Sequence, residues 1–400
     1  MKKNIPKNVI LLGFVSLLND IASDMIYPLL PLFITSAGGN AKTLGMIEGV
    51  SETVSSILKL VSGKISDSIR KRKLLAFLGY FLSNALRPLY YFVNHWETIF
   101  IIRFLDRVGK GIRTAPRDAL IAESVITKDW GRAFGFHRSL DNLGAFIGPM
   151  ISSLLLAYFT KDIKNIFLLS LIPGMIVIFL FIFVREKQSE QDLKTQKQVD
   201  IGNDNGFDSL PINVKLFILS VLIFTIGNSS DAFLILRLKE AGIDTVYIPF
   251  IWGIFNLIKS AGNYPSGLIS DRIGRRKVIF IGWLLYACVY FLLGTVKDKY
   301  IVLFLFLLYG GYYSITEGAE RAYIADNVTI NMRGRAYGYY NFAISITSLP
   351  ASLLFGYLWD KFSYKVAFYS GAFFSAVAIF ILLFSSERAR DIFGFLKRRI

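Results

Sequence analysis

The sequence predicts an all-α membrane protein with twelve transmembrane helices in two homologous six-helix bundles. Three observations predict this fold. Of the 400 residues, 54% are hydrophobic and 18% are charged, below the roughly 25% typical of soluble domains. Apolar runs such as 74–93 and 278–296 reach the ~20 residues that cross a bilayer as a helix. The third observation is that the second half of the chain repeats motifs of the first.

Two motifs carry this repeat. GKISDSIRKRK at 63–73 returns as GLISDRIGRRK at 267–277, and GRAFG at 131–135 returns as GRAYG at 334–338. Both pairs lie at nearly the same spacing, and the segment between the halves is polar and poor in apolar residues. We expect three parts: an N-terminal bundle over 1–190, a cytoplasmic linker over 191–211 and a C-terminal bundle over 212–400.

The repeat also decides the number of helices. Residues 97–120 are too polar to be recognised as a span by hydropathy, but they align with the apolar stretch 301–326. Counting both as spans gives six per half. With both termini in the cytoplasm, most Lys and Arg residues then fall in cytoplasmic segments, as the positive-inside rule requires. The net charge of +16 therefore indicates cytoplasmic loops and not nucleic-acid binding.

Several functions are excluded by what the sequence lacks. Its one cysteine, Cys288, cannot form an intramolecular disulfide and argues against a cysteine-based metal site. The sequence contains no nucleotide-binding loop, hydrolase triad or metal-ligand cluster, so we expect neither an enzyme nor a bound cofactor or metal. The expected partners are the lipid bilayer, a small-molecule substrate and protons or another coupling ion. We expect a monomer in the cytoplasmic membrane.

The whole chain resembles the major facilitator superfamily. GLISDRIGRR at 267–276 is similar to the family motif between spans two and three, and RFLDRVG at 103–109 resembles the fourth-span motif with two substitutions. GAFIGP at 144–149 is similar to the first part of a fifth-span motif of drug/proton antiporters, although Ser152 and Ser153 replace its final glycines. The resemblance implies a central cavity, lined by spans 1, 4, 7 and 10, that opens to each side in turn.

The resemblance implies a secondary active transporter that moves a small organic solute by alternating access. The partial antiporter motif favours proton-coupled export. A carrier for an anionic metabolite, with a carboxylate or phosphate, is the alternative, because span 4 carries many cations. A membrane sensor or lipid-handling protein is a third hypothesis.

Five cations of span 4 fall on one face of a helix that turns by about 100° per residue. They are Arg103, Arg107, Lys110, Arg113 and Arg117. Placing all of them in lipid would cost on the order of 12–17 kcal/mol, which excludes that orientation. Two interpretations stay open. Arg103, Arg107 and Lys110 bind an anionic group of the substrate, or the cations pair with acids of spans 1, 2 and 5. Those acids are Asp20, Asp24, Glu48, Glu52 and Asp141.

Other spans add aromatic and amide side chains to the predicted substrate site; these are Tyr27, Asn228, Trp252, Asn256, Tyr313 and Glu317. A cationic wall facing an aromatic, amide-rich wall suits an amphipathic organic solute with an anionic group. Helix packing alone is the other explanation for the tyrosines.

Four residues are predicted to couple transport to protons. Asp20 and Asp24 lie one turn apart in span 1, and His137 and Asp141 lie one turn apart in span 5. Carboxylates within membrane spans often carry protons or ions, and His titrates near physiological pH. Static pairing with span 4 is the alternative for the aspartates, and a packing role is the alternative for His137.

The two repeated loops are predicted to act as gates. In the family that this chain resembles, the acid and the bases of such loops latch the cytoplasmic ends of the helices. The matching residues are Asp67, Arg70, Arg72, Asp271, Arg272, Arg275 and Arg276.

Overall fold

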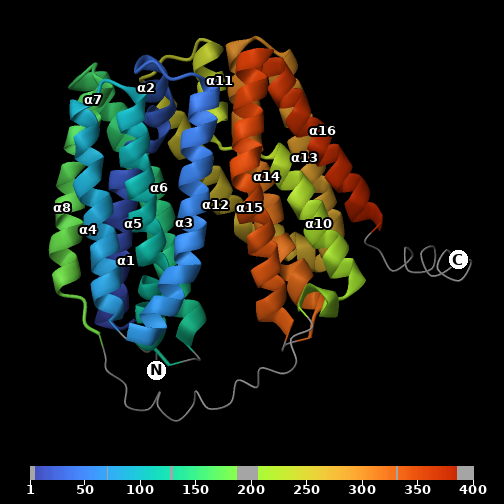
Figure 1. The fold of residues 1–400 in the computed structure, drawn as a ribbon, viewed down its shortest axis with the longest axis horizontal. Helices are drawn as coiled ribbons and strands as arrows, with labels where there is room; N and C mark the ends of the chain where they lie inside the picture. Colours follow the sequence, from blue (N-terminus) through green and yellow to red (C-terminus); the bar gives the residue numbers. More distant parts are fainter. Residues whose placement is uncertain (1–4, 70, 127–128, 187–205, 330–331, 385–400) are drawn as a thin grey trace, which may run out of the picture.

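The computed structural model describes residues 5–69, 71–126, 129–186, 206–329 and 332–384. Within these ranges the chain crosses the molecule in twelve helical passages (Figure 1). We call the end where α1 and α10 begin the terminal end, and the opposite end the far end. The chain is all-helical, as the composition and the repeat predict.

The first six passages form one side of the molecule (Figure 1). They are α1 (Lys7–Asp24) with η1 (Tyr27–Leu29) and α2 (Leu30–Ser36), α3 (Ala41–Ile69), α4 (Arg72–Leu86) with η2 (Arg87–Phe92), α5 (Trp96–Glu123), α6 (Trp130–Tyr158), and α7 (Ile163–Leu169) with α8 (Leu171–Ile182).

The last six passages form the other side. They are α10 (Ile212–Gly227) with α11 (Ala232–Glu240), α12 (Ile248–Ile273), α13 (Arg275–Thr295), α14 (Lys299–Asn327), α15 (Arg333–Lys361) and α16 (Tyr364–Phe384). Most of the expected linker 191–211 lies outside the described residues, which resume with the short helix η5 (Gly206–Ser209).

Eight of the described helical segments are long and apolar enough to cross a membrane, and α5 is not among them. The repeat nevertheless predicts a helix over 97–120, and α5 (Trp96–Glu123) confirms it. The charged side chains that lower its hydropathy are largely buried; Arg103, Asp106, Arg107 and Arg113 are all less than a tenth exposed. Helices of its own half, above all α3 and α4, pack against this polar helix and shield it from lipid.

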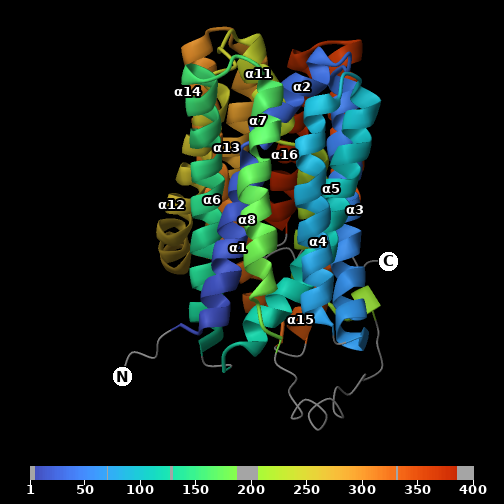
Figure 2. The same ribbon diagram turned by 90° about the vertical axis from the view of Figure 1, so that its left-hand side faces the viewer.

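Apolar side chains cover the outer faces of the bundle. Figure 2 looks onto the first half, with α8 and α4 toward the viewer. On α8, Ile172, Met175 and Phe179 are each about 60% exposed, which only a lipid environment makes favourable. Phe373 of α16 is exposed in the same way on the second half.

Passages 1 and 7 are each interrupted part-way. In passage 1, α1 ends at Asp24 and a 3₁₀ turn follows, with Pro28 and Pro31 at the starts of the next two helical pieces. Proline cannot continue a helical ladder but suits the first turn of a new helix. In passage 7, α10 ends at Gly227 and α11 begins at Ala232. Both interruptions lie beside the cavity described below.

The two halves touch closely at the far end, where α3 packs against α15. A Cβ atom at Gly45 would overlap the carbonyl oxygen of Ser352, and one at Gly356 would lie 2.5 Å from the carbonyl oxygen of Ala41. Glycine is therefore required for this approach. In Figure 1, α3 and α15 diverge toward the terminal end.

Two hydrogen bonds from backbone to carboxylate secure the same contact. The backbone N–H groups of Ala41 and Lys42 donate to Asp360, over 3.1 and 2.7 Å. These donors are free because they begin α3, so a carboxylate of the second half caps a helix of the first half. A second bridge joins the halves at this end, where the Ser153 hydroxyl donates to the Val246 carbonyl over 2.7 Å.

Candidate functional site

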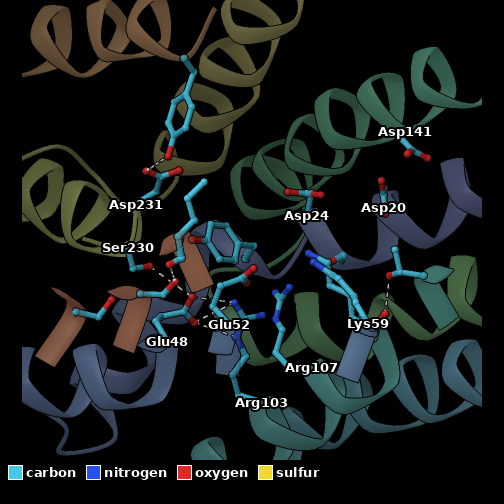
Figure 3. A pocket seen from close by; sticks show the side chains of 18 of the residues that line it. Asp20, Asp24, Glu48, Glu52, Lys59, Arg103, Arg107, Asp141, Ser230 and Asp231 are labelled. Carbon is cyan, nitrogen blue, oxygen red and sulfur yellow. Dashed lines mark hydrogen bonds and ion pairs between the residues drawn. The ribbon is translucent and has the colours of Figure 1, made fainter. Parts of the chain in front are cut away.

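A cavity of about 610 Å³ lies between the two halves, lined by residues of both (Figure 3). Nine basic side chains line it: Lys59, Arg87, Arg103, Arg107, Lys110, Arg113, Arg117, Arg138 and Lys259. Six acidic side chains also line it: Asp20, Asp24, Glu48, Glu52, Asp141 and Asp231. The lining is therefore polar and has an excess of positive charge, nearly all of it on the first half.

Arg103 is held by a carboxylate of α3. Its Nε and Nη2 donate to the two oxygens of Glu48 over 2.9 and 3.0 Å, a bidentate pair. The guanidinium also stands 5.3 Å from the centroid of the Tyr27 ring. The Ser230 hydroxyl reaches Glu48 from the second half over 3.5 Å, so this pair lies where the halves meet.

Asp106 lies at the centre of three arginines. Arg87 donates to it over 3.1 Å, and the guanidinium nitrogens of Arg103 and Arg107 come within 3.9 and 3.8 Å. Arg87 also donates to the backbone and side-chain oxygens of Asn19, over 3.2 and 3.3 Å. The hydrogen bonds of Arg87 with Asp106 and Asn19 tie α5 to η2 and α1.

The cations nearer the terminal end of α5 are engaged with protein groups. Arg113 donates to the Ser83 hydroxyl over 2.8 Å. Arg117 donates to Asp118 over 2.8 and 2.9 Å and to Ser16 over 3.4 Å. Among the described residues, neither arginine pairs with an acid of spans 1, 2 or 5, because Arg113 bonds a hydroxyl and Arg117 bonds an acid of its own helix; the contact of Arg103 with Glu48 is of the predicted kind.

Arg107 and Lys110 are different. Arg107 is 6% exposed, but its buried Nε has no hydrogen-bond partner, since the contact with Asp106 is too long for one. Figure 3 shows its guanidinium pointing into the cavity. Lys110 lines the cavity one turn further along α5, and among the described residues its ammonium makes no hydrogen bond or ion pair. These two cations face the cavity with unused donors.

The predicted proton-coupling residues gather on α1 and α6. Asp20 and Asp24 line the cavity, and the indole nitrogen of Trp252 donates to Asp24 from the second half over 3.4 Å. On α6, His137 Nδ1 lies 3.4 Å from an oxygen of Asp141. The other oxygen of Asp141 and the Nε2 of His137 are buried without a hydrogen bond. Within the described residues, no group of His, Cys, Asp and Glu could hold a metal ion.

The wall formed by the second half is built on the interruption of passage 7. The hydroxyls of Tyr309 and Tyr313 both donate to one oxygen of Asp231, over 2.9 and 3.3 Å. Tyr309 also reaches the side-chain oxygen of Asn228 at 3.3 Å. The ammonium of Lys259 lies 4.0 Å from the centroid of the Tyr313 ring. This wall holds both hydrogen-bond donors and acceptors.

Of four other predicted substrate residues, two line the cavity and two do not. Tyr27 and Trp252 meet across the cavity with ring centroids 5.0 Å apart. Asn256 is not among the lining residues and donates to a backbone carbonyl of α6 over 3.2 Å. Glu317 is also outside the lining and faces Arg138 of the first half at 3.9 Å.

The residues of the second repeated loop form contacts at the terminal end. Arg275 pairs with Asp271 of its own loop and with Asp326 of α14, the latter over 3.2 Å. Arg276 donates from Nε to a carbonyl at the end of α16 over 3.0 Å, and Arg272 is exposed. These contacts tie helix ends within the second half, away from the cavity.

The first repeated loop is described only in part. Arg72 pairs with Glu123 at the end of α5, and its backbone N–H donates to Glu186 over 2.6 Å. Arg70 and the side chain of Asp67 lie outside the described residues. Arg72 thus joins three helix ends of the first half.

Comparison with known sequences identifies the family. The sequence model of the Major Facilitator Superfamily matches residues 12–258 and 216–394, which together span nearly the whole chain. The chain belongs to the Major Facilitator Superfamily. Members of this family are transporters and not enzymes, so the protein is a multi-pass membrane transporter with a small-molecule substrate.

Relatives of this superfamily member include an uncharacterized MFS-type transporter of Methanocaldococcus jannaschii, 38% identical and matched over 96% of both chains. The tetracycline resistance protein, class H, of Pasteurella multocida is 22% identical over 91% of both chains. Among solved structures, a mutant of the nucleoside transporter NupG superposes with a TM-score of 0.79 at 12% identity, over 95% of this chain and 100% of that one. The last likeness shows the fold alone.

Several residues of this superfamily member line the cavity without having been assigned to the predicted substrate site. Glu48, Asp231 and Lys259 are among them. Asp231 is marked by its charge within a largely apolar stretch of the sequence. Lys259 is marked by its charge within an apolar helix, which indicates a position facing protein or water.

Proposed function

We propose that this superfamily member transports a small organic solute that carries a carboxylate or phosphate group. The observation that carries this proposal is the buried guanidinium of Arg107, which points into the cavity with an unused donor. A buried donor without a partner costs free energy, and an anion in the cavity would remove that cost. The planar guanidinium suits carboxylate and phosphate, and Lys110 adds a second charge.

The same geometry narrows the anion site from three predicted cations to two. Arg103 has one edge of its guanidinium, Nε and Nη2, on Glu48, and its Nη1 lies 3.9 Å from Asp106, so it is already held by a carboxylate of the protein. Arg107 and Lys110 are the proposed anion ligands, with Tyr27 and Trp252 as aromatic neighbours of the organic part.

Removal of the Arg107 charge tests this proposal. In a thermal-shift assay at constant ionic strength, small organic anions should stabilise the purified wild-type protein. The Arg107→Gln variant should bind them about tenfold to a hundredfold more weakly, since a charge-assisted hydrogen bond is lost. Arg107→Lys should keep part of the affinity. The control is Arg185→Gln, which removes an exposed arginine outside the cavity. Equal stabilisation of wild type and Arg107→Gln would refute the proposal.

We further propose proton coupling through Asp20, Asp24 and Asp141, with His137 beside Asp141. Asp24 is the most direct candidate, because its carboxylate accepts a hydrogen bond from Trp252 of the opposite half. Its protonation would weaken this contact between the halves, because a neutral carboxyl is a poorer acceptor than a carboxylate, and this links a proton to the movement.

An Asp24→Asn variant should lose accumulation driven by a pH gradient in proteoliposomes. Exchange of labelled for unlabelled substrate should continue, because the neutral amide keeps the shape of the site. Asp208→Asn is the control, since that side chain is 97% exposed and lies outside the helices of the cavity. Undiminished accumulation in Asp24→Asn would remove Asp24 from the coupling mechanism.

A proton-coupled exporter of drugs is the second candidate. It is supported by the antiporter-like GAFIGP segment and by the similarity to a tetracycline resistance protein. Stabilisation by lipophilic cations or neutral drugs, with no response to organic anions, would favour it.

We place both termini in the cytoplasm and the protein, as a monomer, in the cytoplasmic membrane. The bundles over 1–190 and 212–400 are then the two units that rock about the cavity. In that placement the structure is closed on the outside, through Asp360 and the glycines of α3 and α15. Asp271, Arg272, Arg275 and Arg276, with Asp67, Arg70 and Arg72, are proposed to set how the helix ends meet when the cytoplasmic side closes.

A further inference from the structure

The interruption of passage 7 exposes polar groups to the cavity. Between α10 and α11 the four residues Asn228 to Asp231 are not helical, and all four line the cavity. Within a membrane, irregular backbone is tolerated where it is buried in protein or borders a water-filled space. A half-helix that stops beside a cavity is also how transporters commonly build their binding sites.

The Asp231 carboxylate is fixed in place, but only one of its two oxygens forms hydrogen bonds in the described part of the chain. Both tyrosine hydroxyls, from Tyr309 and Tyr313, donate to its Oδ1. No hydrogen bond or ion pair among the described residues involves its Oδ2. Tyr309 is fully buried, so the carboxylate is oriented by a rigid partner. Asp231 therefore presents a preorganised hydrogen-bond acceptor to the cavity.

Ser229 adds an unused hydroxyl beside it. The side chain is 5% exposed and lines the cavity, and its buried Oγ lies near the Tyr290 hydroxyl without a hydrogen bond of good geometry in the described structure. A buried hydroxyl without a partner costs free energy, as the Arg107 donor does. The cavity is thus lined on one wall by the Arg107 donor, and on the other by the Ser229 hydroxyl and the Asp231 oxygen that forms no hydrogen bond to a described residue.

The charges on this wall select among possible ligands. Asp231 is an acceptor and would repel a carboxylate or phosphate. Lys259, with its ammonium over the Tyr313 ring, also lines the cavity and would repel an ammonium group. A hydroxyl both donates and accepts, so it can donate to Asp231 and accept from Lys259 or Ser229 without charge repulsion. A wall of this composition fits neighbouring hydroxyl groups.

We infer that the wall around Asp231, Ser229 and Lys259 binds hydroxyl groups, and that the transported solute is a polyhydroxylated organic anion. This inference rests on the proposed function. Arg107 and Lys110 hold the carboxylate or phosphate on one wall, and the hydroxylated carbons reach the other. Figure 3 shows Arg107 and Asp231 on opposite sides of the cavity. Sugar acids and sugar phosphates have this chemistry.

The experiment compares matched six-carbon probes by thermal shift at constant ionic strength. Gluconate and glucose 6-phosphate carry hydroxyls, hexanoate carries none, and 6-aminohexanoate carries an ammonium instead. At least one hydroxylated probe should bind wild type about tenfold or more tightly than hexanoate, the effect of one good hydrogen bond to a charged group. Asp231→Asn should remove that preference and leave hexanoate binding unchanged.

Two further variants distinguish a loss of hydroxyl binding from misfolding. Tyr309→Phe keeps Asp231 but removes the shorter of the two hydrogen bonds that orient it, so the preference should fall without a change in charge. Asp208→Asn, on an exposed side chain, should behave as wild type. The shift caused by each probe is measured relative to the melting temperature of the same variant without ligand. A general loss of stability is then not mistaken for a loss of binding.

The outcomes separate this inference from the proposed function. If hexanoate binds as well as both hydroxylated probes, with a dependence on Arg107, the anion site stands and the hydroxyl wall is wrong. Preference for 6-aminohexanoate would also refute the hydroxyl wall, and would indicate an ammonium at Asp231. If no anion stabilises the protein in an Arg107-dependent way, the proposed function itself fails, and the inference with it.

Discussion

A Gly45→Ala variant should fold but lose transport by about fivefold or more, because overpacking by even one methyl group costs about 1–3 kcal/mol. The added Cβ would overlap the Ser352 carbonyl oxygen where α3 meets α15. Backbone cannot rotate away as a side chain can, so the far end could not close as it does in this structure. The carrier would then lose one of the two states between which it must alternate.

Transport into proteoliposomes, with a melting curve of each variant, measures this effect. Gly311→Ala is the control. A Cβ atom there would lie 3.9 Å from a methyl carbon of Leu285, which is an ordinary van der Waals contact, and both residues belong to the second half. Full transport by a well-folded Gly45→Ala variant would show that the cycle does not need the close contact of α3 and α15.

An Asp106→Ala variant should be destabilised by about 3–5 kcal/mol, the usual cost of leaving a buried charge without its partner. Three guanidinium groups, those of Arg87, Arg103 and Arg107, now face this one carboxylate. Without it they would repel one another in a region where each is almost fully buried. A large fall in the melting temperature of the purified protein is the expected reading.

A compensating change makes this prediction specific. In an Asp106→Ala, Arg87→Met double variant, the apolar side chain replaces the cation that is bonded most closely to Asp106. Part of the lost stability should return, because a buried ion pair can often be replaced by apolar residues at little cost. A double variant no more stable than Asp106→Ala would show that Arg87 stabilises the fold through Asn19 and not through Asp106.

Much of the fold follows from the sequence, because the repeat supplies what hydropathy cannot. The helix over 97–120 is the best example: its charges hide it from a hydropathy scan, but its apolar counterpart in the second half reveals it. The interruption of passage 1 also has a local signal in Pro28 and Pro31. The interruption of passage 7 contains no proline and so has no such local signal. It coincides with hydrogen bonds from α14 to Asp231, which the sequence does not reveal.

The roles of the span 4 cations could not be separated by sequence alone. All five share one helical face, so helical periodicity treats them alike. Their roles depend on which acid each meets, and Glu48 lies 55 residues from Arg103 along the chain. A partner at that separation is chosen by helix packing, which periodicity does not reveal. Arg107 has no bidentate partner of this kind among the described residues, and its nearest carboxylate is that of the adjacent Asp106, 3.8 Å away.

The far-end contact is made by backbone atoms and short side chains. Glycines bring the backbones of α3 and α15 together, and the carboxylate of Asp360 binds N–H groups that are already ordered at the start of α3. Fixing a long side chain at an interface costs about 0.5–1.5 kcal/mol in lost rotamer freedom, and this contact fixes almost none. The halves can therefore meet and part at this end with little change in conformational entropy. The balance between the two states of the carrier is then set mainly by the charged groups of the cavity.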